Sequence, residues 1–224
     1  MSNEVTGELL IDDEFKSLIP PLRPSELAAL EQSLTEHGCL HALTVWGRTV
    51  IDGHNRYVIC RRLGIPFQIV RLSFDSREEV KWWIISNQSA RRNLSLVQSA
   101  YLRGAYWHTA KDSRLPKFNR KAGETALPDK FSHRMQVVGD TFGVSASTIR
   151  GDYILYQAIE KLGPVAKAYT LSGEACLRKQ CVIDLSALSE PAQVSLLRAV
   201  EFGSVGTLTT AISALKGRAV NGQR

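Results

Sequence analysis

The strand–turn–helix pattern of residues 50–65 constrains the fold of this chain more than any other stretch. Its sequence, VIDGHNRYVICRRLGI, begins as an apolar strand, passes through a polar turn at residues 52–55 and continues as an amphipathic helix from about Arg56. A glycine in such a turn, Gly53, lets a ligand approach the backbone, and the free N–H groups of the helix start attract negative charge. Arg56 adds a guanidinium that can donate two hydrogen bonds to a phosphate. The stretch therefore predicts a phosphate-binding turn.

Short strands are expected on both sides of this turn. Residues 43–51 are typical of a β-hairpin with its turn at Gly47 and Arg48, and residues 9–11 and 67–72 are apolar enough to form further strands. With helices between them, these strands predict a mixed α/β unit over the first 95 residues or so.

Two helices of this unit have recognisable starts. Ser25 is a natural cap for a helix that ends near Gly38, and Ser76 caps a second one with Glu79 three residues later. The second helix is expected to bury Val80, Trp83, Ile84 and Ile85 and to end in a second polar turn, residues 86–94.

The remainder of the chain is expected to be helical. Ser95 caps a helix that runs to about Thr109. The window from residue 103 to residue 134 then holds eight lysine or arginine residues against three acidic ones, together with Pro116, Gly123 and Pro128. This composition predicts either a solvated linker or a segment that contacts a nucleic-acid backbone. Amphipathic helices over residues 165–215 are expected to serve packing or self-association.

A helix-turn-helix is predicted after the basic window. Residues 134–141 form the first helix, residues 142–144 form the turn, and Ser145 caps a second helix that reaches about Leu162. The side chains expected to face DNA lie at the start of this second helix, where the motif contacts base edges; they are Ser145, Ser147, Thr148 and Arg150.

Composition favours an anionic partner. The chain has 224 residues, and its 28 Lys+Arg exceed its 22 Asp+Glu, which gives a net charge of +6. No apolar run is long enough to cross a membrane, and no leader is recognisable, so a cytoplasmic protein associated with the nucleoid or a plasmid is expected. The four cysteines lack the spacing of a metal site.

Two motifs make the chain resemble the ParB-like family, in which a ParB N-terminal domain with a sulfiredoxin-like fold precedes a helix-turn-helix. The family pattern G-E-R-R-x-x-A falls on residues 53–59, where the glycine and the second arginine match and His54 and Asn55 replace the glutamate and the first arginine. The pattern E-N-x-x-R falls on residues 87–91, where Asn87 replaces the glutamate. The resemblance spans residues 8–165 and is closest to free-standing members on mobile elements.

The resemblance implies an α+β protein with three parts: a nucleotide-binding domain at 1–95, a helix-turn-helix domain at 96–165 and a C-terminal helical region at 166–224. In family members that bind CTP with Mg²⁺, the two motifs surround the triphosphate. The corresponding residues here are Gly53, His54, Asn55, Arg56, Asn87, Gln88, Arg91 and Arg92. Two interpretations of His54 remain open, contact with a ligand and capping of the turn.

The replacement at Asn87 bears on catalysis. A neutral amide cannot act as a base at pH 7, so nucleotide binding with at most weak CTP hydrolysis is expected. The alternative is a nuclease or a nucleotide-dependent phosphotransferase on the same fold, although Asp52 is the one carboxylate near the turn in sequence. Sulfiredoxin activity is disfavoured because the turn lacks a cysteine.

The resemblance also implies partners. They are double-stranded DNA, a second copy of the chain in a homodimer and, in partition systems, a partition ATPase. The basic residues expected on the DNA backbone are Lys117, Arg120 and Lys121. The target sequence and the biological process, whether partition, copy control or transcriptional regulation, are not encoded in a recognisable pattern.

Overall fold

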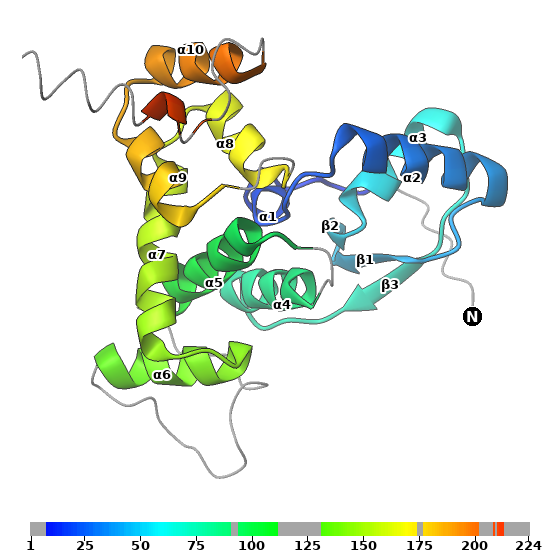
Figure 1. Ribbon diagram of the computed structural model, residues 1–224. Coiled ribbons are helices and arrows are strands. Elements are labelled where there is room, and N and C mark those ends of the chain that lie inside the picture. Colours follow the sequence, from blue (N-terminus) through cyan, green and yellow to red (C-terminus); the bar gives the residue numbers. More distant parts are fainter. Residues whose placement is uncertain are drawn as a thin grey trace, which may run out of the picture. The chain divides into compact units, whose positions relative to one another are not determined.

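The computed structural model describes residues 8–90, 94–111, 131–173, 177–201, 208 and 210–212 (Figure 1). The chain divides into two compact units, the first containing the described residues up to 90 and the second containing those from 94 onward. Each unit is described by itself below.

A small mixed sheet forms the centre of the first unit. Its strands are β1 (Leu43–Trp46), β2 (Thr49–Asp52) and β3 (Ile69–Leu72), in the order β2-β1-β3. β1 pairs antiparallel with β2 and parallel with β3. The predicted hairpin is therefore confirmed, and its turn uses a positive φ of 59° at Gly47. The strand expected at residues 9–11 is reduced to a bridge between Leu10 and Thr49.

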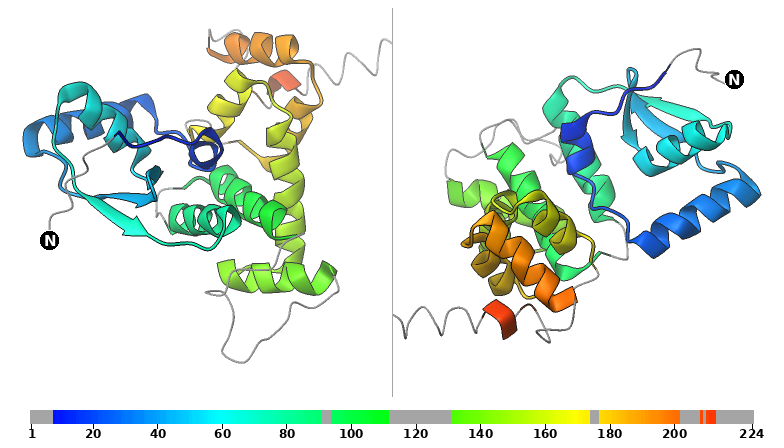
Figure 2. Two further views of the ribbon diagram at one scale, coloured as in Figure 1. Left: turned by 180° about the vertical axis from the view of Figure 1, so that it is seen from behind. Right: turned by 90° about the horizontal axis from the view of Figure 1, so that it is seen from above.

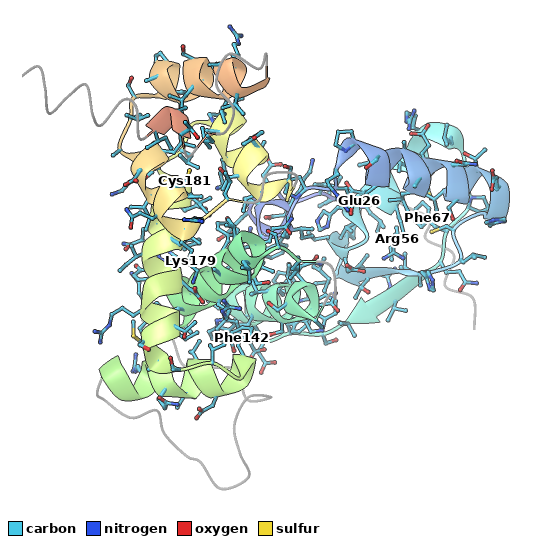
Figure 3. The ribbon with its side chains drawn as sticks, viewed as in Figure 1. Glu26, Arg56, Phe67, Phe142, Lys179 and Cys181 are labelled. Atoms are coloured by element: carbon cyan, nitrogen blue, oxygen red, sulfur yellow. The ribbon has the colours of Figure 1, made fainter. Side chains whose placement is uncertain are left out.

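Four helices accompany this sheet within residues 8–90. They are α1 (Asp13–Ser17), α2 (Pro24–His37), α3 (His54–Leu63) and α4 (Arg77–Ser89). α3 packs on β1, α2 lies alongside α3, and α4 contacts β2 (Figure 1). Tyr57 anchors α3 to the core, because its hydroxyl donates to the Leu9 carbonyl at 2.9 Å and its ring meets Phe67, labelled in Figure 3, edge to face. These contacts fix the orientation of the β2–α3 turn.

Three helix boundaries differ from the sequence prediction. α2 begins at Pro24 and not after a Ser25 cap, because proline fits the first helical position, where its missing N–H costs nothing. α3 begins at His54, so His54 and Asn55 belong to the helix and not to a turn. α4 continues to Ser89 and includes the residues expected to open a second polar turn.

The second unit is helical in every described element, as the sequence predicts. Its helices are α5 (Leu96–Ala110), α6 (Phe131–Phe142), α7 (Ala146–Glu160), α8 (Pro164–Leu171), α9 (Lys179–Ser186) and α10 (Glu190–Glu201). Ser95 caps α5 in a capping box with Gln98, which confirms the predicted start. The long helix α7, best seen in Figure 2, contacts α5, α6, α8 and α9. It is the central helix of this unit.

The mixed α+β class is thus confirmed, whereas the expected domain limits at 95/96 and 165/166 stay a prediction. In the described part of the chain, no helix is both long and apolar enough to cross a membrane.

Candidate functional site

The β2–α3 turn is built around Gly53. This residue has φ 89° and ψ 26°, a left-handed conformation that glycine adopts without strain. A Cβ placed on it would lie 2.7 Å from Leu43 Cδ2 and 3.0 Å from Arg56 Nη2. Both the backbone conformation and the close packing therefore require glycine. Gly53 is the N-cap residue of α3 and has no side chain to cap it, so the helix starts with N–H groups suited to an anion.

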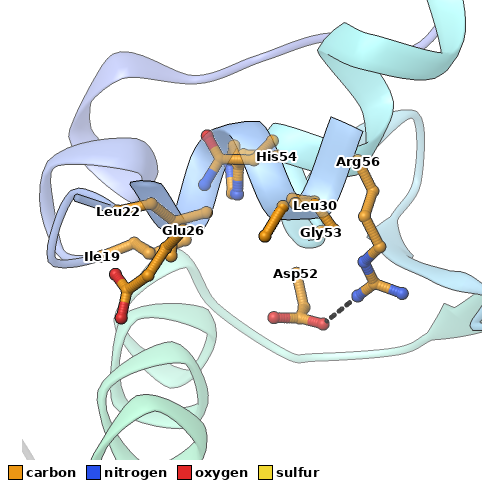
Figure 4. Close-up of a pocket in the computed structure, with 10 residues that line it drawn as sticks. Ile19, Leu22, Glu26, Leu30, Asp52, Gly53, His54 and Arg56 are labelled. Carbon is orange, nitrogen blue, oxygen red and sulfur yellow. Dashed lines mark hydrogen bonds and ion pairs between the residues drawn. The ribbon is translucent and has the colours of Figure 1, made fainter. Parts of the chain in front are cut away.

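Arg56 is already engaged within the protein. Its Nη2 pairs with Asp52 Oδ2 at 2.8 Å, the contact drawn as a dashed line in Figure 4. Its Nη1 donates to the carbonyls of His41 and Ala42 at 2.7 and 3.1 Å. The guanidinium thus ties the segment before β1 to the turn. A phosphate that used Arg56 would have to displace Asp52.

Among the residues that the structure describes, two cavities open beside this turn. The first has a volume of about 540 Å³, and Figure 4 shows Asp52 and Arg56 towards one end of it and Ile19, Leu22 and Glu26 towards the other. It is lined by Ile19, Leu22, Glu26, Ala29, Leu30, Asp52, Gly53, His54, Asn55 and Arg56. The second, of about 470 Å³, is lined by Asp13, Lys16, Ser17, Ile19, Pro20, Pro21, Leu22, Leu27, His54 and Asn55. The glycine, histidine, asparagine and arginine of the first motif therefore share one cavity with Asp52.

His54 does not cap the turn, so that interpretation of it is wrong. The residue is 4% exposed, and neither ring nitrogen has a hydrogen-bond partner in the described part of the chain. Burial lowers the pKa of the imidazole below its ordinary value, and the negative charge of Asp52 partly opposes this shift. The Val50 backbone acts weakly in the same direction as Asp52, but it forms no hydrogen bond of normal geometry with the ring. The ring is therefore favoured in its neutral form, with one nitrogen as donor and the other as acceptor.

The second motif adopts a different structure from the one expected. Asn87 and Gln88 lie in the last turns of α4, and the predicted polar turn beginning at residue 86 is wrong. Val80, Ile84 and Gln88 follow each other at four-residue intervals, so the buried face of the helix continues through Gln88.

Neither amide of this motif lines the two cavities. Asn87 is exposed, whereas Gln88 is fully buried and its side-chain oxygen and nitrogen lack hydrogen-bond partners among the described residues. Arg91 and Arg92 lie outside the described residues. Within the described ranges, no group of three histidine, cysteine, aspartate or glutamate residues is arranged to hold a metal ion. The geometry therefore supports the first motif as a ligand site more directly than the second.

A second candidate site lies where α6 meets α7. Gly143 turns the chain with φ 65°, and the Val144 N–H donates to the Gly139 carbonyl at 2.9 Å. A Cβ on Gly139 would overlap the Val144 carbonyl oxygen, so this glycine allows the turn to fold back tightly on α6. The sequence interpretation missed Gly139, although a glycine four residues before the turn glycine is a visible feature.

The start of α7 presents polar side chains to solvent. Ser145 caps the helix, since its Oγ accepts from the Thr148 N–H at 3.2 Å, as predicted. Ser147 and Arg150 are exposed, Thr148 is half-buried, and Ile149 is fully buried against the unit's core. The hydroxyls of Ser147 and Thr148 lie 2.8 and 2.9 Å from Ser145 Oγ. Lys117, Arg120 and Lys121 lie outside the described residues.

An interior charge cluster holds α7 in place. Asp152 has no exposed surface, and its carboxylate pairs with Arg103 of α5 at 2.6 Å and with Lys179 at the start of α9, labelled in Figure 3. At the α5–α7 crossing, a Cβ on Gly104 would lie 2.5 Å from the Asp152 backbone oxygen. The close crossing and the charge cluster, neither of which the sequence interpretation found, orient the exposed face of α7.

These features define a class of α+β protein in which a small mixed sheet with flanking helices is joined to a helical unit. Solved ParB N-domains share this fold. A pNOB8-like ParB-N domain matches with a TM-score of 0.52 and 19% identity over 86% of this chain and 88% of that one. A second structure of the pNOB8-like ParB N-domain matches with a TM-score of 0.51 and 19% identity over 98% of this chain and 94% of that one.

A third structure is more distant. The C-terminally truncated chromosome-partitioning protein ParB from Caulobacter crescentus, complexed to the centromeric parS site, gives a TM-score of 0.39 and 18% identity over 93% of this chain and 95% of that one. The sequence matches no protein-family model and no curated protein. The likeness to the two pNOB8-like domains shows a common fold.

Proposed function

We propose that this chain is a ParB-like DNA-binding protein that acts in the partition or regulation of a plasmid or mobile element. The observation that carries the proposal is the exposed start of α7, where Ser147 and Arg150 face solvent on a helix that follows a short turn after α6. This placement suits direct contact with base edges. The net charge of +6 and the ParB N-domain fold support the same function.

The proposal includes a role for each remaining part. A homodimer would read two half-sites of double-stranded DNA, and a partition ATPase would be the partner in a partition system. Such a protein would be associated with the nucleoid or with the plasmid that carries its site. Lys117, Arg120 and Lys121 would contact the DNA backbone.

The first unit would sense a nucleotide, CTP with Mg²⁺. Three features of the β2–α3 turn support this part: the glycine at Gly53, the uncapped start of α3 and a cavity of about 540 Å³, a size typical of small-ligand sites. The Asp52–Arg56 pair adds a requirement, because triphosphate binding through Arg56 would exchange one anion for another. Mg²⁺ would be held mainly by the nucleotide phosphates, because Asn87 and Gln88, the candidates from the second motif, line neither cavity and Gln88 is fully buried.

The DNA-binding role is tested by selecting bound sites from random double-stranded DNA and then comparing two variants on the selected site. Arg150→Ala is expected to reduce discrimination between specific and non-specific DNA by about 1–3 kcal/mol. Arg198→Ala removes the same charge from an exposed position on α10 and is expected to leave discrimination unchanged. An Arg150→Ala protein with the wild-type ratio of affinities would overturn the assignment of α7 as the recognition helix.

The nucleotide-sensing role is tested by calorimetric titration of the four nucleoside triphosphates with Mg²⁺, with and without DNA, followed by phosphate-release and DNA-nicking assays. Binding of CTP with little turnover is expected. Arg56→Ala should weaken CTP binding, whereas Arg61→Ala, on the same helix and exposed, should not. If no nucleotide binds, this part of the proposal fails while the DNA-binding part stands.

A further inference from the structure

Two cysteines that are far apart in the sequence lie side by side in the first unit. Cys60 is a buried residue of α3, and Cys39 lies in the segment between α2 and β1. Cys39 is half-buried and packs against the apolar cluster formed by Leu34, Ile59 and Cys60. Both cysteines are free thiols. The fold therefore brings together a thiol pair that the sequence spacing does not indicate.

The two thiols interact directly with each other. Burial, together with the charge and hydrogen bonding of the Cys39 thiol, raises the pKa of Cys60 to about 11, and the positive charge of Arg56 opposes this shift. Cys39 Sγ also donates to the His41 carbonyl at 3.4 Å. Cys39 is thus held next to Cys60 by a backbone hydrogen bond and by apolar packing.

Exposure separates the roles of the two thiols. Cys39 can be reached from solvent, whereas Cys60 is 1% exposed. A thiolate attacks a disulfide more readily than a thiol does, and the raised pKa keeps Cys60 protonated at neutral pH. An oxidant from solution therefore reacts first at Cys39, and Cys60 is positioned to attack the product.

We propose that Cys39 and Cys60 form a disulfide-forming site whose co-substrate is a small-molecule disulfide such as glutathione disulfide. The Cys39 sulfur attacks one sulfur of the co-substrate, the S–S bond breaks, and one small thiol leaves with the proton of Cys39. The Cys60 sulfur then attacks Cys39 Sγ in the mixed disulfide, and the second small thiol leaves with the proton of Cys60. The protein loses two electrons and two protons, and the co-substrate gains both.

The protein disulfide joins α3 to the segment before β1. An oxidised Cys39 has no S–H group, so the hydrogen bond to the His41 carbonyl is lost. The same carbonyl accepts from Arg56 Nη1 at 2.7 Å. Oxidation therefore alters the surroundings of a group that anchors Arg56, whether or not the chain binds a nucleotide.

Incubation of the folded full-length chain with glutathione disulfide at about pH 8, followed by alkylation of the remaining thiols and peptide mass mapping, tests the proposal. Wild type is expected to yield peptides joined through Cys39 and Cys60. Cys60→Ser should stop after the first step and retain glutathione on Cys39 at a level about tenfold or more above wild type, because the intramolecular attack is removed. Cys181→Ser changes a buried cysteine of α9 and is the matched control; it should form the Cys39–Cys60 bond as wild type does.

The mapping of wild type needs no variant and decides the outcome even if Cys60→Ser fails to fold. Wild type that keeps glutathione on Cys39 while Cys60 remains a free thiol would overturn the inference, as would an unmodified Cys39. The inference also fails if the joined peptides appear only when the chain is unfolded in denaturant before oxidation. Each of these results leaves the proposed DNA and nucleotide binding unaffected.

Discussion

Gly53 combines two constraints that mutation can separate. Its positive φ disfavours any side chain, and its neighbours Leu43 and Arg56 leave no room for a Cβ. Gly64 ends the same helix with a φ of 68°, but no described atom lies within 4 Å of the Cβ position there. Gly64 therefore isolates the cost of the backbone conformation from the cost of packing.

We expect Gly53→Ala to destabilise the protein more than Gly64→Ala does. The left-handed conformation alone costs an alanine about 1–2 kcal/mol, and overpacking against Leu43 adds about 1 kcal/mol or more. Denaturant unfolding of both variants measures the difference in free energy of unfolding. Equal losses would show that Leu43 and the Arg56 guanidinium move aside without cost.

Burial of His54 predicts a dependence of stability on pH. Because its pKa in the folded protein lies below the ordinary value of 6.5, the unfolded chain binds the proton more tightly. The stability that depends on a neutral His54 is therefore complete above pH 6.5 and is lost as pH falls from 6.5 towards the folded pKa. Asp52 and Asp12 favour the protonated ring, whereas Lys16 opposes it.

Denaturant unfolding at about pH 7.5 and about pH 5.5 tests this linkage. Wild type should lose more stability between these values than His54→Phe does, since the variant has no imidazole to protonate. His37→Phe controls for removal of an exposed imidazole. Identical pH dependence in wild type and His54→Phe would contradict the burial of a neutral ring.

Among the elements, α7 depends on the charge cluster at Asp152. Breaking a buried ion pair by removing one partner costs about 3–5 kcal/mol, because the remaining charges lose their compensation. We therefore expect Asp152→Ala to destabilise the second unit by this amount, reduced to the extent that Lys179, whose side chain is 43% exposed, regains contact with water. Thermal and denaturant unfolding measure this loss of stability.

Asp140→Ala is the matched control for this prediction. Asp140 is an exposed aspartate on α6 that accepts a hydrogen bond from Gln136 at 2.8 Å. Its replacement should change stability by no more than about 0.5 kcal/mol. An Asp152→Ala protein as stable as Asp140→Ala would mean that the cluster does not hold α5, α7 and α9 together.

The sequence predicts an element well where neighbouring residues alone determine its conformation. The hairpin turn at Gly47 and the caps Ser95 and Ser145 belong to this group, because each satisfies a backbone requirement within a few residues. The predicted turns of the two family motifs do not belong to this group. His54 and Asn87 are polar, so composition favours loops, yet both lie in helices whose apolar faces continue past them.

The contacts of the candidate sites are predicted less well than the elements. Gly53 and Arg56 follow from the motif, but the pairing of Arg56 with Asp52 requires knowing that the turn places them side by side. The Asp152 cluster joins residues from three helices, and the buried Trp82 replaces the predicted Trp83 on the α4 face. Such choices depend on tertiary packing, which a periodic pattern does not encode.

At the scale of the whole molecule, DNA affinity has two possible sources: the total positive charge and direct contacts of particular basic residues. The two sources predict different salt dependences of DNA binding. Removing one cation that binds a DNA phosphate should reduce the slope of log affinity against log salt by about 0.9. Alanine at Lys117, Arg120 and Lys121 should therefore lower this slope by about 2.7 and weaken binding to all sequences alike. The change lowers the net charge from +6 to +3.

A second triple variant with the same net charge decides between the two explanations. Arg48, Arg61 and Arg62 are exposed residues of the first unit, and ion pairs at such positions contribute little to stability. Replacing them with alanine also lowers the net charge to +3. If salt titrations show the reduced slope for the first variant alone, the basic segment contacts DNA directly. An equal reduction of the slope in both triple variants would attribute DNA affinity to overall charge. Long-range attraction depends on the net charge of the protein, whereas direct binding depends on where the basic residues lie.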